Sequence, residues 1–342
     1  MKKLILFFAL PFLTISCSAY NADSVADIYQ IEQINKKVFV WKNDKKLPFE
    51  ITFNSSQTYI SDMFVKNNDV YIMAREVVEL GRGEVGIEVK FVCRLWKNGK
   101  LLFESSSILP RKIFVNDNND FYFVGNASIW KNGVETKIKH EQQYGFAQNI
   151  FVSNDNVYVV GRDYFDAIID VNGKVSYLEK DTASSFVSDA RSVFVTENND
   201  VYVVGSTRVK DGNNIAVLWK NFEPQYFTDG KSHGRAEDVL VVDTNVYVVG
   251  CVANKKGNNV AMLWKNGVAQ KLENGENLKA QYIYVVGNDV YVWGYGETFI
   301  SGFPPKNSFY SKLWKNGKEI ELLKKDCFGE CRSVFVVAKE KE

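Results

Sequence analysis

Histidine and cysteine are scarce in this 342-residue sequence, which contains only His140, His233 and five cysteines. A structural zinc site needs four nitrogen or sulfur ligands close together, so we expect no metal centre. Charge of one sign is also lacking, because 42 Lys and Arg residues face 41 Asp and Glu residues. A nearly neutral chain gives no electrostatic case for nucleic-acid binding. After the N-terminal segment, no apolar run is long enough to cross a bilayer as a helix.

The usual signatures of catalysis are absent as well. The sequence has no Gly-x-Ser-x-Gly elbow, no phosphate-cradling glycine-rich loop and no His-Glu-x-x-His motif. His233 lies on an expected loop where chemistry could take place, but an isolated loop histidine is more commonly solvated than catalytic. We therefore expect no catalytic residues and no cofactor.

The N-terminal segment, residues 1–19, has the pattern of a secretory signal peptide. Lys2 and Lys3 precede an apolar run from Leu4 to Ile15 and a group of small residues. The order Ile15-Ser16-Cys17 is similar to a bacterial lipoprotein cleavage box, which would place a lipid on Cys17. Cleavage after Ala19 by ordinary signal peptidase is the alternative. Either route predicts export to the bacterial cell envelope or secretion.

The four remaining cysteines fall into two groups, two expected free thiols and two expected disulfide partners. Cys93 and Cys251 lie inside apolar runs of different repeats, so we expect buried free thiols. Cys327 and Cys331 flank Phe-Gly-Glu, and a local disulfide is expected there in an oxidising compartment.

Two short phrases alternate along the chain. Trp-Lys-Asn recurs at Trp41, Trp96, Trp130, Trp219, Trp264 and Trp314. Val-Tyr-Val-Val-Gly and its looser copies place a tyrosine or its equivalent at residues 71, 122, 158, 202, 247 and 291. A period near 44 built from short β-type runs is typical of a β-propeller blade.

Each repeat contains four β-type runs separated by turn residues. In one of them these runs are 192–195, 201–204, 215–219 and 224–227. The first run has seven copies, which begin at Met63, Ile113, Ile150, Val193, Val239, Ile283 and Val334. The last copy has no strands after it, and Trp41 has no first run before it, so pairing of the two chain ends would complete a blade. We predict that residues 20–342 form one seven-bladed β-propeller, with six or eight blades as alternatives.

Connection lengths predict which face carries function. The turns between the first and second strands and between the third and fourth strands are short throughout. The connections on the opposite face vary, and the longest span 75–89 and 295–310. Variable loops on a rigid scaffold commonly bind partners. Tyr295, Phe299, Phe303 and Tyr310 are therefore candidate partner-binding residues, unless this loop folds back over the disc.

A second candidate site lies two residues before each first-strand triplet. These positions are all polar: Ser61, Arg111, Gln148, Arg191, Glu237, Gln281 and Arg332. In a propeller they should surround the mouth of the central channel on the variable side. Guanidinium and amide groups there would suit an anionic or polyhydroxylated ligand. The alternative is that these residues are polar only because a soluble ring meets water there.

The alternation of Val-Tyr-Val-Val-Gly, Leu-Trp-Lys-Asn-Gly and Ser-Val-Phe-Val resembles repeats of uncharacterised secreted bacterial β-propeller proteins. This resemblance implies a β-propeller and brings no catalytic residues. The Trp-Asp and Gly-His signatures of WD40 repeats and the Gly-Gly of kelch repeats are missing, so no function carries over from those proteins.

These observations predict a non-catalytic binding or scaffold module of the cell envelope. It would engage a protein or a glycan through the variable face, with the membrane contacted only through a lipid on Cys17. We expect a monomer. The alternative is an envelope hydrolase or lyase that acts on a glycan or an anionic substrate at the channel mouth.

Overall fold

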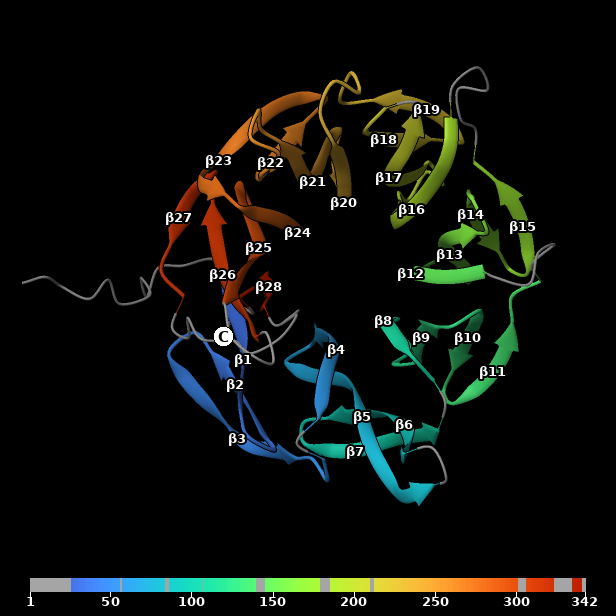
Figure 1. Ribbon diagram of the computed structural model, residues 1–342, viewed down its shortest axis with the longest axis vertical. Helices are drawn as coiled ribbons and strands as arrows, with labels where there is room; N and C mark the ends of the chain where they lie inside the picture. Colours follow the sequence, from blue (N-terminus) through green and yellow to red (C-terminus); the bar gives the residue numbers. More distant parts are fainter. Residues whose placement is uncertain are drawn as a thin grey trace, which may run out of the picture.

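A computed structural model describes residues 26–55, 57–83, 86–106, 108–139, 145–178, 185–209, 212–300, 306–322 and 334–339. Seven four-stranded antiparallel sheets stand around a common axis (Figure 1). The chain is therefore a seven-bladed β-propeller, which confirms the predicted fold and decides against six or eight blades. The part of the chain that the structure describes contains no helix long and apolar enough to span a membrane.

The strands of each blade are called A to D from the axis outward. The A strands are β28 (Val334–Ala338), β4 (Thr58–Lys66), β8 (Pro110–Val115), β12 (Gly145–Ser153), β16 (Ser185–Val195), β20 (Gly234–Val242) and β24 (Leu278–Val286). The B strands are β1 (Ala26–Ile34), β5 (Asp69–Gly83), β9 (Phe121–Gly125), β13 (Asn156–Asp163), β17 (Val201–Val209), β21 (Asn245–Ala253) and β25 (Asp289–Ile300).

The C strands are β2 (Lys37–Lys42), β6 (Gly86–Lys97), β10 (Ser128–Lys131), β14 (Asp166–Val171), β18 (Asn214–Lys220), β22 (Asn259–Lys265) and β26 (Lys306–Lys315). The D strands are β3 (Lys45–Thr52), β7 (Lys100–Ser106), β11 (Val134–Lys137), β15 (Lys174–Tyr177), β19 (Glu223–Tyr226), β23 (Val268–Glu276) and β27 (Lys318–Ile320).

Blade 1 is built from both ends of the chain, as the sequence predicts. Strand β28 pairs with β1 in antiparallel register from Ala26↔Ala338 to Gln30↔Val334. Val334 and Val336 are buried against Ile28 and against residues of blade 7. This pairing closes the ring and supplies blade 1 with its inner strand, so β1 is not left as an exposed edge.

The Trp-Lys-Asn phrase encodes the turn between strands C and D. In blade 2, Asn98 has a φ of 48° and is followed by Gly99 at 80°, the positive values that a tight hairpin turn requires. Asn98 Oδ1 accepts the Val70 N–H at 2.8 Å, and its Nδ2 donates to Asp69 Oδ1 at 2.7 Å. The same asparagine-to-backbone bond occurs in all seven blades, including blade 4, whose repeat lacks the tryptophan.

The lysine of the phrase ties the turn to strand B. Lys97 Nζ lies 2.6 Å from Asp69 Oδ2 and 5.4 Å from the centre of the Tyr71 ring. The hydrogen bond to Asp69 raises the pKa of Lys97, because it favours the charged form. Five of the six tryptophans of the phrase are buried, and Trp41 is half-buried. Both repeat phrases are thus structural, and their aromatic rings are core residues.

Asn98→Ala is expected to lower the free energy of unfolding by about 2–3 kcal/mol, since alanine loses both hydrogen bonds and strains the positive φ. Urea unfolding followed by tryptophan fluorescence measures this loss. Asn98→Gly is the matched control, because glycine keeps the backbone conformation and loses only the hydrogen bonds. Equal stability of the alanine and glycine variants would contradict the contribution of backbone strain.

Candidate functional site

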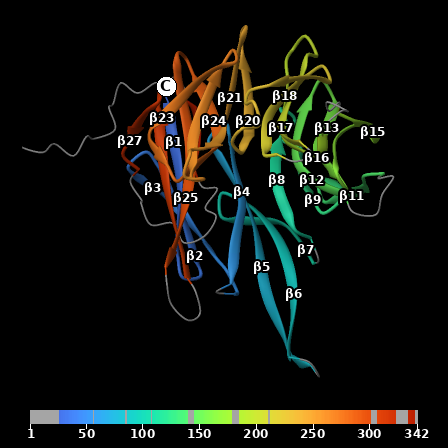
Figure 2. The same cartoon turned by 45° about the horizontal axis from the view of Figure 1, so that its top comes forward.

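The longest B–C connections form β-hairpins rather than irregular loops. Strands β5 and β6 stay paired as far as Gly83↔Gly86, and β25 and β26 as far as Ile300↔Lys306. Both hairpins project from the same side of the disc (Figure 2). We call this side, which carries the B–C and blade-to-blade connections, the variable face. The opposite side carries the short A–B and C–D turns and is called the turn face.

The polar positions predicted at the channel mouth coincide with β-bulges. In blades 2 to 7 the pairing of strand A with strand B skips one residue near the variable face. The skipped residues are Ser61, Arg111, Gln148, Arg191, Glu237 and Gln281. Arg332, the corresponding residue of blade 1, lies outside the described residues. The polar positions predicted from the sequence are therefore the bulge residues of the A strands. Bulges commonly redirect side chains next to binding sites.

The bulge also explains the glycine that ends Val-Tyr-Val-Val-Gly. A Cβ atom on Gly205 would stand 1.9 Å from the carbonyl oxygen of Asp189, and one on Gly250 would stand 2.0 Å from that of Arg235. The bulge pushes these carbonyl groups onto the neighbouring strand, where only glycine leaves room. Blade 2 has Ala74 at this position, paired with Ile60.

Below the variable face, aromatic rings of the A strands encircle the axis. The members of this aromatic collar are Phe64, Phe114, Phe151, Phe194, Tyr284 and Phe335. Neighbouring ring centres in the collar are 5.0–5.6 Å apart. Each ring is the middle residue of a predicted first-strand triplet, so the collar follows from the repeat itself.

A polar tier lies between this collar and the variable face. Lys112 of blade 3 reaches Asp62 of blade 2 at 3.3 Å and stands 4.3 Å from the Tyr282 ring centre of blade 7. Blades 3 and 7 are not neighbours in the ring (Figure 1). The contact with Tyr282 therefore reaches across the axis.

On the other side of this tier, the hydroxyl of Ser192 donates to Asp238 Oδ1 at 2.6 Å. Burial raises the pKa of Asp238, although Lys112 acts in the opposite direction. The polar groups of this tier bond to one another. We therefore place the candidate site above them, at the variable face.

Charged residues gather on the variable face of blades 5, 6 and 7. Arg191 Nε lies 2.7 Å from Asp189 Oδ2, and Arg235 Nε lies 2.5 Å from Glu237 Oε1. Lys279 occupies the corresponding place in blade 7, two residues before the bulge residue Gln281. We call these five residues the charged arc. Two of the predicted mouth residues, Arg191 and Glu237, belong to it, whereas Arg111, Gln148 and Gln281 are half-buried at their own bulges.

Apolar residues occupy the equivalent positions of blades 2, 3 and 4. Tyr59, Leu109 and Phe146 are 50%, 38% and 41% exposed, respectively. They correspond to Asp189, Arg235 and Lys279, because each stands two residues before the bulge residue of its blade. We call them the apolar arc. These residues were not predicted, although the repeat fixes the position two residues before each bulge residue.

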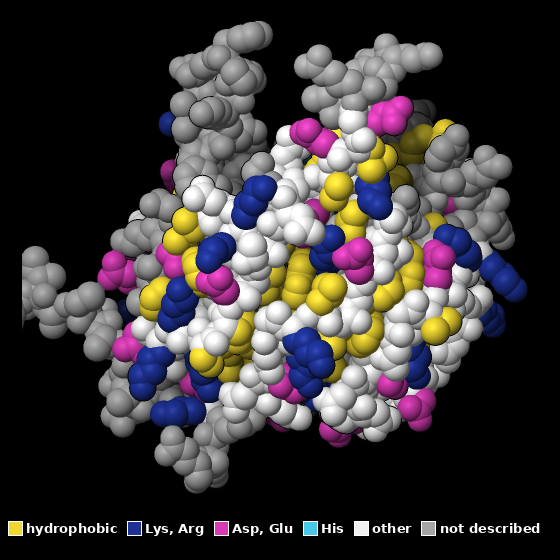
Figure 3. All heavy atoms as spheres, turned by 90° about the horizontal axis from the view of Figure 1, so that it is seen from below, with side chains coloured by type: hydrophobic (Ala, Val, Ile, Leu, Met, Phe, Trp, Pro, Cys, Tyr) yellow, Lys and Arg dark blue, Asp and Glu magenta, His cyan; other side chains and the backbone are white. Residues whose placement is uncertain are grey.

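The hairpin of blade 2 extends the apolar arc. The guanidinium of Arg75 stands 5.0 Å from the Tyr59 ring centre and 5.1 Å from the Phe91 ring centre. Leu80 and Val89 on the same hairpin are 58% and 45% exposed. In the side view of Figure 3, by contrast, hydrophobic and charged side chains are interspersed over the rim.

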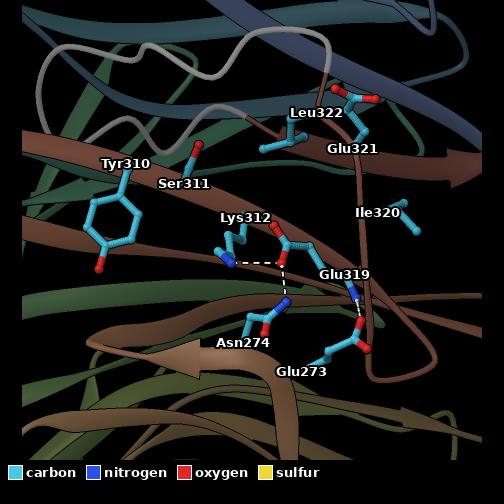
Figure 4. Close-up of a pocket in the computed structure, with 9 residues that line it drawn as sticks. All are labelled: Glu273, Asn274, Tyr310, Ser311, Lys312, Glu319, Ile320, Glu321 and Leu322. Carbon is cyan, nitrogen blue, oxygen red and sulfur yellow. Dashed lines mark hydrogen bonds and ion pairs between the residues drawn. The ribbon is translucent and has the colours of Figure 1, made fainter. Parts of the chain in front are cut away.

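Of the four predicted partner-binding aromatics, the structure describes the side chains of Tyr295 and Tyr310. The ring of Tyr295 lies tilted against that of Trp293, with ring centres 5.9 Å apart, and burial raises the pKa of Tyr310. Tyr310 borders a rim pocket of about 530 Å³ between blades 6 and 7 (Figure 4). There Glu319 already accepts from Lys312 at 2.7 Å and from Asn274 at 3.0 Å. Phe303 and the side chain of Phe299 lie outside the described residues.

The remaining candidates are placed as follows. Cys93 and Cys251 are buried free thiols, as predicted, and burial raises their pKa values to about 12 and 11. Cys17, Cys327 and Cys331 lie outside the described residues. Nδ1 of His233 accepts the Asn214 N–H at 3.1 Å. Among the described residues, no group of three or more His, Cys, Asp or Glu could hold a metal ion.

No protein-family model matches this sequence, and no curated protein is significantly similar to it. Solved structures share the architecture at low identity. The extracellular domain of a proposed hybrid two-component system from B. thetaiotaomicron is 11% identical with a TM-score of 0.33, and the match covers 88% of this chain and 52% of that one.

The WD40 domain of SCAP from fission yeast is 9% identical with a TM-score of 0.42, over 88% and 89% of the two chains. Tricorn protease is 9% identical with a TM-score of 0.37, over 88% and 36%. This chain thus spans about half the length of the first of these proteins. With such TM-scores, none of these likenesses carries a functional argument.

Proposed function

We propose that this chain is a non-catalytic binding module of the bacterial cell envelope that engages a polypeptide partner through its variable face. Export rests on the signal-like segment 1–19, with Cys17 as the candidate lipid attachment site. The observation that carries the proposal is the division of the variable face into an apolar arc on blades 2–4 and a charged arc on blades 5–7.

Exposed apolar side chains next to arginine are what protein interfaces use. Interface cores are enriched in aromatic residues and arginine, and a few such residues supply most of the binding energy. Tyr59, Arg75 and Phe91 form such a group, since the guanidinium contacts both rings. Leu80 and Leu109 favour a polypeptide over a glycan, because aliphatic side chains give sugars neither a flat stacking surface nor hydrogen bonds.

The alternative of a hydrolase or lyase finds no specific support in the described residues. The carboxylates of the charged arc, Asp189 and Glu237, are each paired with an arginine. Each of these carboxylates thus faces a cation of the protein itself. His233 is exposed and already accepts a backbone N–H.

Site-specific photo-cross-linking tests the proposal. A photoreactive residue at Tyr59 or Phe146 is expected to capture a defined protein from envelope extract. The same residue at Val134, which is 71% exposed on the turn face, is the matched control and should capture none. With the captured protein purified, Phe146→Ser is expected to weaken binding about tenfold, because it removes an exposed apolar anchor.

Two outcomes would contradict this function. Equal capture from Val134 and from the apolar arc would show contact without a preferred face. A glycan that raises the melting temperature, with no protein captured, would replace the polypeptide by a sugar. Turnover of such a glycan would establish the hydrolase instead.

A further inference from the structure

The charged arc shares the bulge geometry of the apolar arc but carries a repeated pattern of charge that the apolar arc lacks. In each blade two residues flank a small residue of strand A beside the bulge. Blade 5 has Asp189 and Arg191, blade 6 has Arg235 and Glu237, and blade 7 has Lys279 and Gln281. Blades 5 and 6 thus each carry an acid and a base, whereas blade 7 carries a base and a neutral amide. The arc therefore holds one more cation than anions.

Both arginines are held by one side of their guanidinium groups. Arg191 Nε faces Asp189 and Arg235 Nε faces Glu237. Among the described residues, no hydrogen bond or ion pair engages the terminal Nη atoms of either arginine. The Nε atoms of both arginines, like Asp189 Oδ1 and Glu237 Oε1, are buried without a hydrogen bond, so these contacts are ion pairs and not hydrogen bonds. The two ion pairs thus involve Nε, and among the described residues the paired Nη donors of each guanidinium remain available to a ligand.

The surroundings strengthen electrostatic attraction at this place. Burial alone would lower the pKa of Arg235, but the nearby acidic groups, Glu237 foremost and Asp189 among them, together outweigh it and the pKa is raised. Asp189 and Glu237 are each 8% exposed, and the side chains of Arg191 and Arg235 are each 27% exposed. Charges interact more strongly where solvent is partly excluded. Arg191, Arg235 and Lys279 lie beside the bulges of β16, β20 and β24, which are neighbouring A strands.

We propose that Arg191, Arg235 and Lys279 form a docking site for one carboxylate group of the polypeptide partner. A guanidinium offers two parallel N–H donors that match the two oxygens of a carboxylate. A single negative charge balances the single surplus positive charge of the arc. This inference rests on the proposed function and adds to it the chemistry of the partner, an acidic side chain or a C-terminal carboxylate beside apolar residues that contact the apolar arc.

Fluorescence anisotropy with two labelled peptides tests the site. One peptide carries glutamate flanked by leucine and phenylalanine, and the other has glutamine in place of glutamate. The mature protein is expected to bind the glutamate peptide about tenfold more tightly than the glutamine peptide, and added salt should reduce this preference. Lys279→Gln is expected to remove most of the preference. Arg191→Lys keeps the charge but loses the fork, so it should reduce the preference in part.

Lys256→Gln is the matched control, since Lys256 is exposed on the B–C connection of blade 6 and lies outside the arc. An equal loss in Lys256→Gln and Lys279→Gln would overturn the site in favour of diffuse attraction. Equal binding of both peptides by the wild-type protein would also overturn it. If Phe146→Ser loses peptide binding and the wild-type protein shows no preference for glutamate, the proposed function stands and the carboxylate site is rejected. A glutamate preference that survives Phe146→Ser unchanged would keep the site and count against the apolar arc.

Discussion

A chain that ends at residue 333 is expected not to reach the native fold. It lacks β28, which supplies the inner strand of blade 1 and buries Val334 and Val336. Each buried valine contributes about 2 kcal/mol. Phe335 adds ring contacts to Phe64 and Tyr284 at 5.3 and 5.2 Å, and Tyr284 loses its acceptor on Val334. The sum approaches the whole stability of a typical domain, about 5–15 kcal/mol.

Near-ultraviolet circular dichroism and size-exclusion chromatography measure this effect. The truncated chain should lose its tertiary signal and associate through the exposed edge of β1. A chain that ends at Lys339 keeps β28 and is the control. A synthetic peptide that spans Val334 to Lys339 should partly restore the signal when it is added in trans. A truncated chain that stays monomeric with an unchanged melting temperature would contradict the closure of the ring as a source of stability.

Gly205→Ala is expected to destabilise the protein strongly, by about 3 kcal/mol. The added Cβ would stand 1.9 Å from the Asp189 carbonyl oxygen, so strand A of blade 5 has to move away. Because Asp189 and Arg191 sit at this bulge, the shift should also separate their ion pair. Urea unfolding measures the stability, and the glutamate-peptide preference reports the displacement of Arg191.

Ala74→Gly provides the control at the equivalent position of blade 2. It removes a methyl group where the chain already accommodates one, so a loss of at most about 1 kcal/mol is expected. If Gly205→Ala unfolds at the wild-type urea concentration, the bulge of blade 5 can relax as that of blade 2 does. In that case the glycine would not be a steric requirement.

The fold was predictable because the turn chemistry is local. Each Asn of Trp-Lys-Asn bonds to a residue of the same blade, so the repeat period shows directly where strands begin and end. Counting the first-strand triplets then predicted seven blades. The unpaired strands at the two ends, near Trp41 and Val334, predicted the closure. The projecting hairpins were predicted only as long loops. The paired segments beyond Glu76 lie outside the repeated phrases, so the repeat does not mark them as strands.

The candidate site was predictable only in part. Arg191 and Glu237 were identified from their place before the triplets, because the repeat puts these positions on one face. Their partners Asp189 and Arg235 were not identified, since nothing in the repeat indicates that a bulge turns two residues toward the same neighbour. The apolar arc was missed for a similar reason. Tyr59 and Phe146 resemble ordinary strand residues, and only their exposure distinguishes them.

The sequence by itself determined the blade, the number of blades and the closure of the ring, since these depend on hydrogen bonds and packing within each repeat and between consecutive repeats. Only the tertiary structure decided which residues meet across the axis. Lys112 and Tyr282 lie far apart in the chain and come together because the ring brings blades 3 and 7 to the same axis. The division of the variable face likewise depends on the angular order of the blades, in which three apolar positions and three charged positions fall on opposite arcs.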